Sequence, residues 1–389
     1  MRIVDVAEFY APKGGGVRTY IDRKFTAAAE AGHELFVIAP GPKNAFEPRD
    51  GGGVIWVQAP GLPFDSNYWM FVDAAPVHAH LDRLQPDLVE ASSPWRGAWI
   101  VAKWRGKSPQ TMFMHADPVA SYPQRWLAPH ISPERIDRMF ESFWGHLRRL
   151  AGYFDSSVAG SGWLGRRLRN QGFERVETIR LGADLGAFSP SLRDEGVRAR
   201  LRGELGLPGH GKILLGVGRH HAQKRWPMII SATAAASRDI PMGLVIVGDG
   251  MDRARIARAA QGHPNIQLMT PTRDRQVIAT LFASADALIH GSESETFGLV
   301  AAEALASGLP VILPDRGACS ELAPPDVSEI YRSADVKAAT AAIHRLFTRD
   351  PATLRAASLQ AAPQVRSDAE HYNELFAHYA GILQTAAAK

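Results

Sequence analysis

Short apolar runs alternate with longer amphipathic stretches along the first half of the chain. Residues 2–6 form a strand pattern, residues 17–31 a helical pattern that stops at Gly32, and residues 34–39 a second strand pattern. Further strand patterns lie at residues 54–58, 88–90, 111–115, 156–159 and 176–181, with a helix around residues 98–103. The Gly/Pro-rich passage at residues 40–53 is predicted to be a loop. Such alternation favours a parallel α/β sheet over an all-β or bundle fold.

A second alternating series follows a polar, helical stretch at residues 191–210. Its strand patterns lie at residues 212–216, 244–247, 266–269, 287–290 and 311–313. At 389 residues the chain is long for one hydrophobic core and fits two domains of about 150 to 200 residues each. We therefore expect two Rossmann-like domains with a hinge near residues 185–195, and a ligand site in the cleft between them.

Composition narrows the class of protein without identifying its chemistry. A hydrophobic content of 46% and a charged content of 22% describe an ordinary globular protein, and the net charge of +4 allows anionic partners without requiring nucleic acid. The single cysteine, Cys319, excludes an intramolecular disulfide and fits a reducing compartment. A strand pattern begins directly after Met1, and no apolar run approaches the roughly 18 residues that span a bilayer. We expect a cytoplasmic location, with contact at the inner face of an anionic membrane left open.

Three glycine-rich loops follow predicted strands, at residues 14–16, 218–224 and 248–250. At such places helix N-termini offer backbone N–H groups to phosphates. None of the loops has the dinucleotide or the P-loop spacing, which disfavours both of those classes. Arg219 and Lys224 in the second loop are suited to holding a diphosphate between them. The alternative is a pair of solvated surface cations, which is also what we expect of Lys212 and Arg225.

Two carboxylates stand eight positions apart in the stretch that follows the strand at residues 287–290. Glu295 lies in a polar loop, and Glu303 lies in a helix predicted over residues 297–306 and ended by Gly308. The two side chains are suited to binding sugar hydroxyls and a ribose diol. The alternative is a first-turn acid favoured by the helix dipole, followed by an exposed helical glutamate.

These residues resemble a known family. Glu295 and Glu303 match the E-x7-E signature of retaining glycosyltransferases of family 4, which have the GT-B fold, and Gly218-Arg219 with Lys224 resembles the diphosphate site of that family. Matching segments lie in the same order at residues 14–17, 182–184, 188–190 and 247–250. The resemblance implies an acceptor-binding domain at 1–188, a nucleotide-sugar-binding domain at 189–368 and a C-terminal helix at 369–389 that crosses back to the first domain. The fold implied is α/β, with two parallel sheets facing a central cleft.

The resemblance also implies roles for individual residues. Arg219 and Lys224 would hold and stabilise the leaving diphosphate, Glu303 would bind ribose, and Glu295 would bind the donor sugar. The backbone amides of Phe297, Gly298 and Leu299 would assist Glu295, and His115 would approach the transferred sugar. The implied catalytic residues are His115, Arg219, Lys224 and Glu295, and the glycines implied in the donor-contacting loops are Gly15, Gly16 and Gly248. A histidine at a strand end is otherwise more often structural.

Departures from the family pattern concern the donor more than the reaction. His290-Gly291-Ser292 stands where the family usually has Pro-Ser, and Arg225 stands where Gly commonly follows the lysine. No two aspartates are separated by a single residue, so a metal clamp on the diphosphate is not indicated. We expect a metal-independent retaining transfer without a cofactor. The family's commonest donor makes a UDP-sugar the first expectation and a GDP-sugar the second.

The acceptor must be sought in the first domain, where the aromatic residues gather. Of nine tryptophans, all but Trp226 lie between residues 56 and 163. Phe140, Phe143, Trp144 and Leu147 share one helical face beside Arg148 and Arg149, and residues 68–72 are also amphipathic. Such a face favours a membrane or a lipid acceptor, such as diacylglycerol or a lipid-linked glycan. The alternative is ordinary core.

Two other functions remain open at this stage. A sugar-nucleotide epimerase of the GT-B fold would need no acceptor, and a catalytically silent protein would bind a sugar nucleotide without turning it over. The silent binding protein is disfavoured because the signature side chains are all present, namely Arg219, Lys224, Glu295 and Glu303. An oxidoreductase is disfavoured by the missing dinucleotide fingerprint.

Overall fold

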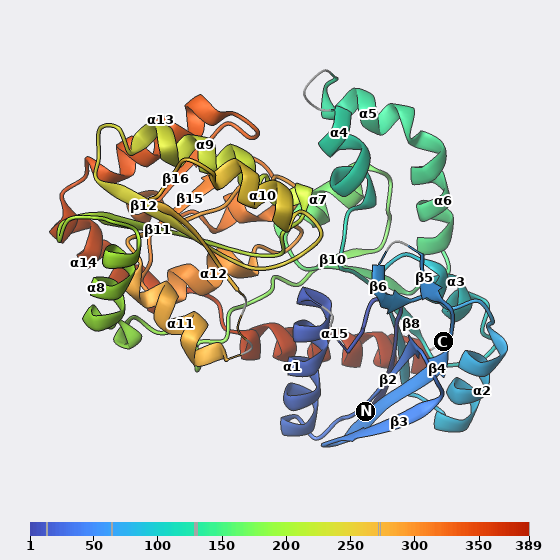
Figure 1. Cartoon of the computed structure of the whole chain (residues 1–389). Helices are drawn as coiled ribbons and strands as arrows, with labels where there is room; N and C mark the ends of the chain where they lie inside the picture. Colours follow the sequence, from blue (N-terminus) through green and yellow to red (C-terminus); the bar gives the residue numbers. More distant parts are fainter. Residues whose placement is uncertain (13–14, 64, 128–130, 271, 273, 389) are drawn as a thin grey trace. The chain divides into compact units, whose positions relative to one another are not determined.

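The structure is a computed structural model that describes residues 1–12, 15–63, 65–127, 131–270, 272 and 274–388. The chain folds into two compact units (Figure 1). As far as they are described, the first comprises Met1–Val119, His130–Arg180 and Ala369–Lys389, and the second Ala120–Pro129 and Leu181–Asp368. Residues 181–188, which we expected to end the first domain, thus group with the second unit. The predicted α/β class with two mostly parallel sheets is confirmed.

The first unit is built on an eight-stranded sheet in the order β10-β9-β8-β7-β1-β2-β4-β3. Its strands are β1 (Arg2–Ala7), β2 (Glu34–Gly41), β3 (Ala45–Arg49), β4 (Gly52–Gln58), β7 (Leu88–Ser92), β8 (Gln110–Met114), β9 (Ser156–Ala159) and β10 (Val176–Thr178). All neighbours pair in parallel except β3 and β4, which are antiparallel. A separate hairpin joins β5 (Gly61–Leu62) to β6 (Asp65–Trp69).

Helices of the first unit cover this sheet. They are α1 (Gly16–Glu30), α2 (Ala75–Leu84), α3 (Arg96–Ala102), α5 (Pro133–Met139), α6 (Glu141–Ala151), α7 (Gly162–Asn170) and α15 (Asp368–Ala387). The C-terminal helix α15 lies beside α1, at the other end of the sequence (Figure 1). The Tyr372 hydroxyl donates to the Tyr20 carbonyl oxygen at 2.6 Å, and His371 Nε2 lies 3.1 Å from the Tyr20 hydroxyl. Buried aromatic and polar contacts therefore hold the last helix to the first one.

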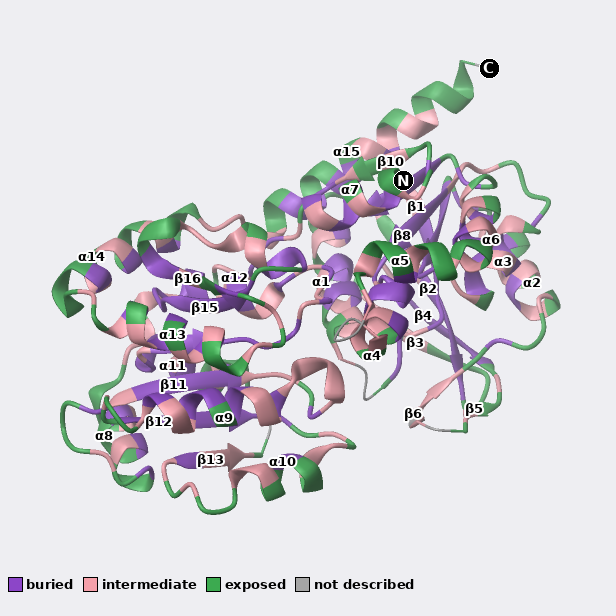
Figure 2. Ribbon diagram, turned by 90° about the horizontal axis from the view of Figure 1, so that it is seen from above, coloured by how far each residue is buried: buried purple, intermediate pink, exposed green. Residues whose placement is uncertain are grey.

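The second unit is built on a six-stranded parallel sheet in the order β13-β12-β11-β14-β15-β16. Its strands are β11 (Lys212–Val217), β12 (Met242–Val247), β13 (Ile266–Met269), β14 (Ala287–Ile289), β15 (Val311–Pro314) and β16 (Ser328–Tyr331). Strands β11 and β12 are apolar over nearly their whole length because both faces of the sheet are covered, and they are drawn as buried in Figure 2. Alternate side chains enter different cores: Leu215 packs with Phe282 and Leu305, and Leu214 packs with Ile230 and Ile343.

Two helical layers enclose this sheet. The helices are α8 (Glu195–Glu204), α9 (Trp226–Ala236), α10 (Arg253–Ala260), α11 (Arg275–Ser284), α12 (Leu299–Ala306), α13 (Val336–Phe347) and α14 (Pro351–Ala361). Helices α9, α10 and α13 lie on one face, and α8, α11 and α12 lie on the other (Figure 1). Helices α8, α11, α13 and α14 each begin after an aspartate whose carboxylate accepts a backbone N–H of the first turn. Short helical turns are η1 (Ala120–Gln124), α4 (Arg125–Leu127), η2 (Pro190–Leu192), η3 (Ala222–Lys224), η4 (Ala318–Leu322), η5 (Pro325–Val327) and η6 (Ala362–Gln364).

Four local predictions need correction. The predicted loop at residues 40–53 contains the edge strand β3, and the predicted strand at 176–181 ends at Thr178. The helix predicted from residue 297 begins at Leu299. The amphipathic segment is two helices, α5 and α6, that meet at Phe140.

The apolar face of α6 is core. Trp144 and Leu147 are buried, and Arg148 donates to the Gln171 carbonyl oxygen at 3.0 Å. This favours the core interpretation over an interfacial helix. In the part of the chain that the structure describes, no helix combines the length and the apolarity that crossing a bilayer requires.

Candidate functional site

The loop after β11 points three consecutive side chains towards the loop that follows β14. Gly218 has a φ of 153°, and the His221 ring nitrogen Nδ1 accepts the Gln223 N–H at 3.3 Å to start the turn η3. Arg225, with a φ of 50°, then caps the N-terminus of α9. A left-handed residue reverses the chain, so Gln223, Lys224 and Arg225 are presented together at the end of the turn.

The loop after β14 receives these three side chains. Gln223 Nε2 donates to Ser294 Oγ at 2.8 Å, and Lys224 Nζ lies 2.6 Å from Glu295 Oε1. Arg225 Nε donates to Glu293 Oε2 at 2.6 Å. Because β11 and β14 are parallel neighbours, their carboxyl ends lie at one edge of the sheet, where ligands bind in open α/β folds. We call residues 218–225 and 290–298 the paired loops.

Lys224 and Glu295 form a partly buried ion pair at the paired loops. Burial raises the pKa of the Glu295 carboxyl, but attraction to Lys224, helped by His290, outweighs burial and holds that pKa well below its usual range. Glu295 is therefore a fixed anion with Lys224 as its counter-ion, and their side chains are only 21% and 14% exposed. His290 Nε2 lies 3.6 Å from Glu295 Oε1, and burial, followed by Lys224, lowers the pKa of the His290 ring.

Close backbone contacts explain the glycines around the paired loops. A Cβ at Gly248 would stand 2.0 Å from the Gly218 carbonyl oxygen, and a Cβ at Gly291 would stand 2.6 Å from that of Lys224. Gly298, with a φ of 76°, caps the N-terminus of α12, and the Ala318 N–H donates to the Glu295 carbonyl oxygen at 2.8 Å. The loops are thus held by backbone contacts as well as by side chains.

The structure brings some of the predicted donor ligands together. Lys224 contacts Glu295, and Phe297, Gly298 and Leu299 follow on the same loop up to the first residue of α12. Arg219 lies in the loop after β11 with an exposed side chain, and its carbonyl oxygen accepts the Trp226 indole N–H at 3.0 Å. Glu303 lies on α12 with a half-buried side chain. The ligand roles of these residues stay predictions.

His115 follows β8 in the first unit and is buried at 6% exposure. Its Nε2 lies 3.3 Å from Ser92 Oγ, and its ring packs against Tyr20. Burial, followed by repulsion from Lys24 and His371, lowers the pKa of His115 to about 3, so the ring is neutral near pH 7. Its approach to a sugar stays a prediction.

The N-terminal glycine loop is described in part. Gly15 caps α1 and Gly16 is its first helical residue, with nothing within 4 Å of the place where a Cβ would stand. Gly14 lies outside the described residues. Nothing in the packing therefore requires a glycine at position 16.

A buried charge network next to His115 was missed by the sequence reasoning. Lys24 Nζ lies 2.5 Å from Glu90 Oε2 and 3.4 Å from Asp5 Oδ2, and all three side chains are fully buried. Ser92 Oγ donates to Asp5 at 3.0 Å and so connects this network to His115. A signal was present, because Lys24 falls on the buried face of α1 with Tyr20, and Asp5 interrupts an apolar strand.

The prediction for Arg225 was wrong. We expected a solvated surface cation, but its side chain is 18% exposed and paired with Glu293. A long-range ion pair of this kind has no local sequence signal, since its partners are 68 positions apart.

Comparison with known proteins adds independent findings. A family profile described as "Glycosyltransferase Family 4" matches residues 14–187, and one described as "Glycosyl transferases group 1" matches residues 197–363. A GDP-mannose-dependent alpha-(1-6)-phosphatidylinositol dimannoside mannosyltransferase of Mycobacterium tuberculosis is 31% identical over 346 residues, which cover 86% of this chain and 87% of the relative. A GDP-mannose-dependent alpha-mannosyltransferase of the same species is 31% identical over 333 residues, which cover 84% of this chain and 82% of the relative.

A solved structure supports the fold. Sucrose-phosphate synthase from Thermosynechococcus elongatus matches with a TM-score of 0.78 and 18% identity, and each chain is covered over 100% of its length. At this identity the likeness shows the fold alone. The fold expected from the sequence is thereby confirmed.

Proposed function

Because the chain belongs to the family 4 glycosyltransferases, with their GT-B fold, we propose that it transfers mannose from GDP-mannose to a hydroxyl of a lipid-linked acceptor. Two relatives that align with most of the chain are GDP-mannose-dependent mannosyltransferases, and this favours GDP over the UDP-sugar expected from the sequence. One of these relatives is a phosphatidylinositol dimannoside mannosyltransferase, which supports a lipid acceptor.

The observation that carries the proposal is the contact between Lys224 and Glu295 at 2.6 Å. The Lys224 ammonium, held where the parallel strands end, can attract the negative charge of a diphosphate. The ionised Glu295 carboxylate can accept hydrogen bonds from sugar hydroxyls. The first amides of α12 stand three to four residues beyond Glu295, where a helix N-terminus favours negative charge. Opposite charges suited to the two ends of a sugar diphosphate therefore stand side by side.

We assign the leaving-group stabilisation to Lys224 and Arg219, without a metal ion. Cations fixed before the reaction stabilise charge as it develops on the diphosphate. The bond between the sugar carbon and the phosphate oxygen breaks, the acceptor oxygen bonds to that carbon on the same face, and its proton passes to the diphosphate. This retaining course, with neutral His115 near the transferred sugar, rests on the family resemblance.

Of the two amphipathic segments in the first unit, only residues 68–72 still support contact with a membrane or a lipid. Helix α6 contributes its apolar face to the core, whereas Met70 and Val72 are 41% and 52% exposed in the segment that follows β6. These two side chains are suited to contact with an apolar acceptor or with an anionic membrane, and the net charge of +4 is compatible with both.

A panel of sugar nucleotides followed by product analysis tests the proposal. A bound donor stabilises the folded protein, so GDP-mannose should raise the melting temperature more than UDP-glucose, UDP-galactose or GDP alone. Product mass should then increase by one hexose on a phosphatidylinositol-type acceptor but not on phosphatidylcholine. Isomerised nucleotide sugar formed without an acceptor would indicate an epimerase, and tight binding without any product would indicate a silent binding protein.

A further inference from the structure

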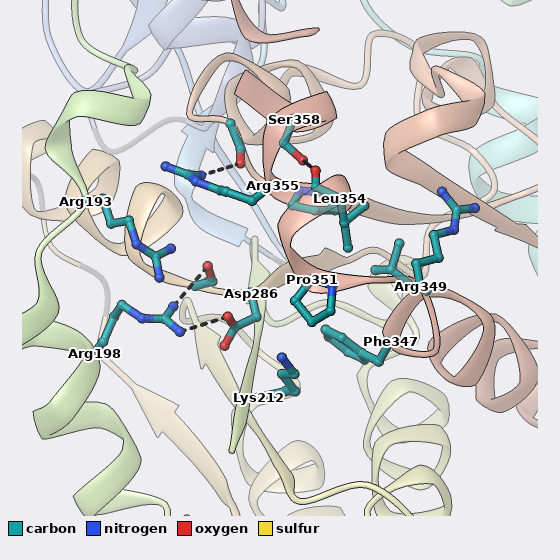
Figure 3. A pocket seen from close by; sticks show the side chains of 14 residues that line it. Arg193, Arg198, Lys212, Asp286, Phe347, Arg349, Pro351, Leu354, Arg355 and Ser358 are labelled. Carbon is teal, nitrogen blue, oxygen red and sulfur yellow. Dashed lines mark hydrogen bonds and ion pairs between the residues drawn. The ribbon is translucent and has the colours of Figure 1, made fainter. Parts of the chain in front are cut away.

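A second site lies at the opposite edge of the second unit's sheet. A cavity of about 300 Å³ is lined there by Lys212, which begins β11, and by Asp286 and Pro310, which precede β14 and β15 (Figure 3). The paired loops follow the other ends of β11 and β14. Strand β11 has six residues, so about 20 Å separates the two edges. The cavity is therefore distinct from the candidate donor site.

Three guanidinium groups gather on one side of this cavity. Figure 3 shows Arg193 and Arg198, from the turn after η2 and from α8, pointing to the same region as Arg355 of α14. Arg198 is fixed in place, since it donates to the Ser284 carbonyl oxygen at 2.5 Å and to Asp286 at 2.8 Å. Arg193 is paired at 2.8 Å with Glu195, whose side chain is 69% exposed.

Negative charge in the cavity does not match this positive charge. Asp286 is the one carboxylate among its lining residues. Within the described part of the chain, neither Lys212 nor Arg355 has a carboxylate at ion-pair distance, and Arg355 donates instead to the Gly308 carbonyl oxygen at 3.0 Å. Burial lowers the pKa of the Arg355 guanidinium, and repulsion from Arg193 and Arg198 lowers it further. Cations gathered in a concave, partly desolvated site are stabilised by an anion that supplies the missing charge.

The opposite wall restricts the size and type of ligand. Phe347, Pro351 and Leu354 line it with apolar surface (Figure 3). A volume of about 300 Å³ is at the low end for small-molecule sites, which favours a compact ligand. A phosphate or diphosphate on a compact neutral body fits both walls.

We propose that this cavity binds a compact phosphate-bearing anion, a phosphate monoester or a diphosphate, with Lys212, Arg193 and Arg355 as its ligands. Arg198, held by Asp286, forms a fixed positive wall behind them. The anion comes from a free metabolite or from a lipid headgroup, since both present the same group to the three cations. The site is independent of the donor site and of the proposed transfer.

Isothermal titration with inorganic pyrophosphate tests the site. Pyrophosphate also suits the paired loops, so three proteins are compared: wild type, Lys224→Gln, and the double variant Lys212→Gln/Arg355→Gln. The binding event of the cavity should persist in Lys224→Gln and weaken at least about tenfold in the double variant, since two charge-assisted contacts are removed. Arg200→Gln, on the exposed face of α8 with a 60% exposed side chain, removes one positive charge outside the cavity and should bind as wild type does.

Two further measurements complete the test. Single Lys212→Gln and the charge-conserving Arg355→Lys replace the double variant if it does not fold. Co-sedimentation with phosphatidylcholine vesicles, with and without phosphatidic acid, separates the two sources. Vesicle binding that needs both phosphatidic acid and Arg355 identifies a lipid headgroup, whereas pyrophosphate binding alone identifies a free phosphate. Pyrophosphate binding that is unchanged in the folded double variant overturns the proposal.

Discussion

Lys224 Nζ lies 2.6 Å from Glu295 Oε1, although the two residues are 71 positions apart in the sequence. Each residue holds the other in place, and flanking contacts from Gln223 to Ser294 and from Arg225 to Glu293 keep the loops aligned. The two family residues therefore act as one unit, and neither can be replaced without releasing the other.

The first prediction is that substitutions at this pair are not additive. Lys224→Gln and Glu295→Gln should each lower kcat/KM by about 10²–10³-fold, because each removes a charge placed for the donor and frees its partner. The double variant should lose much less than the product of the two effects. Transfer kinetics at varied donor concentration measure the three values.

Lys337→Gln is the control for this cycle, since it removes an exposed lysine of the same unit. Its kcat/KM should equal that of the wild type. Near-normal turnover of Lys224→Gln at saturating donor would show that the diphosphate site lies elsewhere.

A second prediction concerns Asp5 in the first unit, where two buried carboxylates share one lysine. Lys24 faces both Asp5 and Glu90 in a fully buried site, and Glu90 is nearer and also accepts the Tyr379 hydroxyl hydrogen bond. Burial, followed by repulsion from Glu90, raises the pKa of Asp5 to about 7, against attraction from Lys24 and a hydrogen bond from Ser92. The folded protein thus keeps a proton on Asp5 that the unfolded chain releases near pH 4.

The sign of the effect follows from this difference. The contribution of Asp5 to stability is complete below about pH 4 and is lost as pH rises through about 7. Asp5→Asn imitates the protonated carboxyl, so the free energy of unfolding of the variant relative to wild type should rise between pH 4 and pH 7. Urea unfolding over that range measures it, with exposed Asp50→Asn as the control. A flat difference would mean that Asp5 is ionised in the folded protein.

A third prediction uses His115, whose contribution has the opposite slope. Its folded pKa of about 3 lies below the ordinary value of 6.5, so the stability it contributes is complete above about pH 6.5 and falls as pH decreases towards 3. His115→Gln should therefore gain stability relative to wild type on acidification, where Asp5→Asn loses it. The His115 ring protons should also show no titration between pH 5 and pH 8 by NMR. A His115 transition in that range would contradict the burial of the ring among Lys24, His371 and Tyr20.

The sequence was sufficient to predict the sheets and the signature residues. Strands such as β11 and β12 are covered on both faces, so they appear as apolar runs with clear ends. Strand β3 was not predictable in this way because it is an antiparallel edge strand with exposed Phe46 and a proline at position 48. Edge strands lack the apolar pattern and tolerate proline.

The site was predictable only as far as its local motifs. Spacing placed Glu295 before a helix and Lys224 after a strand, but their contact depends on how β11 and β14 pair. The pairing of Arg225 with Glu293 depends on the same placement, which is why Arg225 was taken for a surface cation. Likewise, the left-handed backbone at Gly298 delays the start of α12 by two residues, and no residue-type pattern distinguishes that from a helix interior.

A fourth prediction separates structural from functional glycines. Gly298→Ala should destabilise the fold by about 1–3 kcal/mol, since its φ is 76° and a Cβ would stand 3.0 Å from Leu322 Cδ1. Gly248→Ala should be worse, because its Cβ would overlap the Gly218 carbonyl oxygen. Lost transfer in either variant follows from packing alone, so thermal melts should show the loss of stability before any effect on donor binding is assigned.

Gly16 provides the decisive comparison among the predicted donor-loop glycines. A Cβ there meets nothing within 4 Å, and Gly16 is the first residue of α1, so Gly16→Ala should leave stability unchanged or raise it by up to about 1 kcal/mol. If the backbone at Gly16 approaches the donor, the added methyl group should nevertheless raise the KM for the sugar nucleotide several-fold. Gly203→Ala, on the helical surface of α8 and equally open, is the matched control. A Gly16→Ala protein with unaltered KM and kcat would remove Gly16 from the donor site, because no loss of stability could hide or imitate the effect.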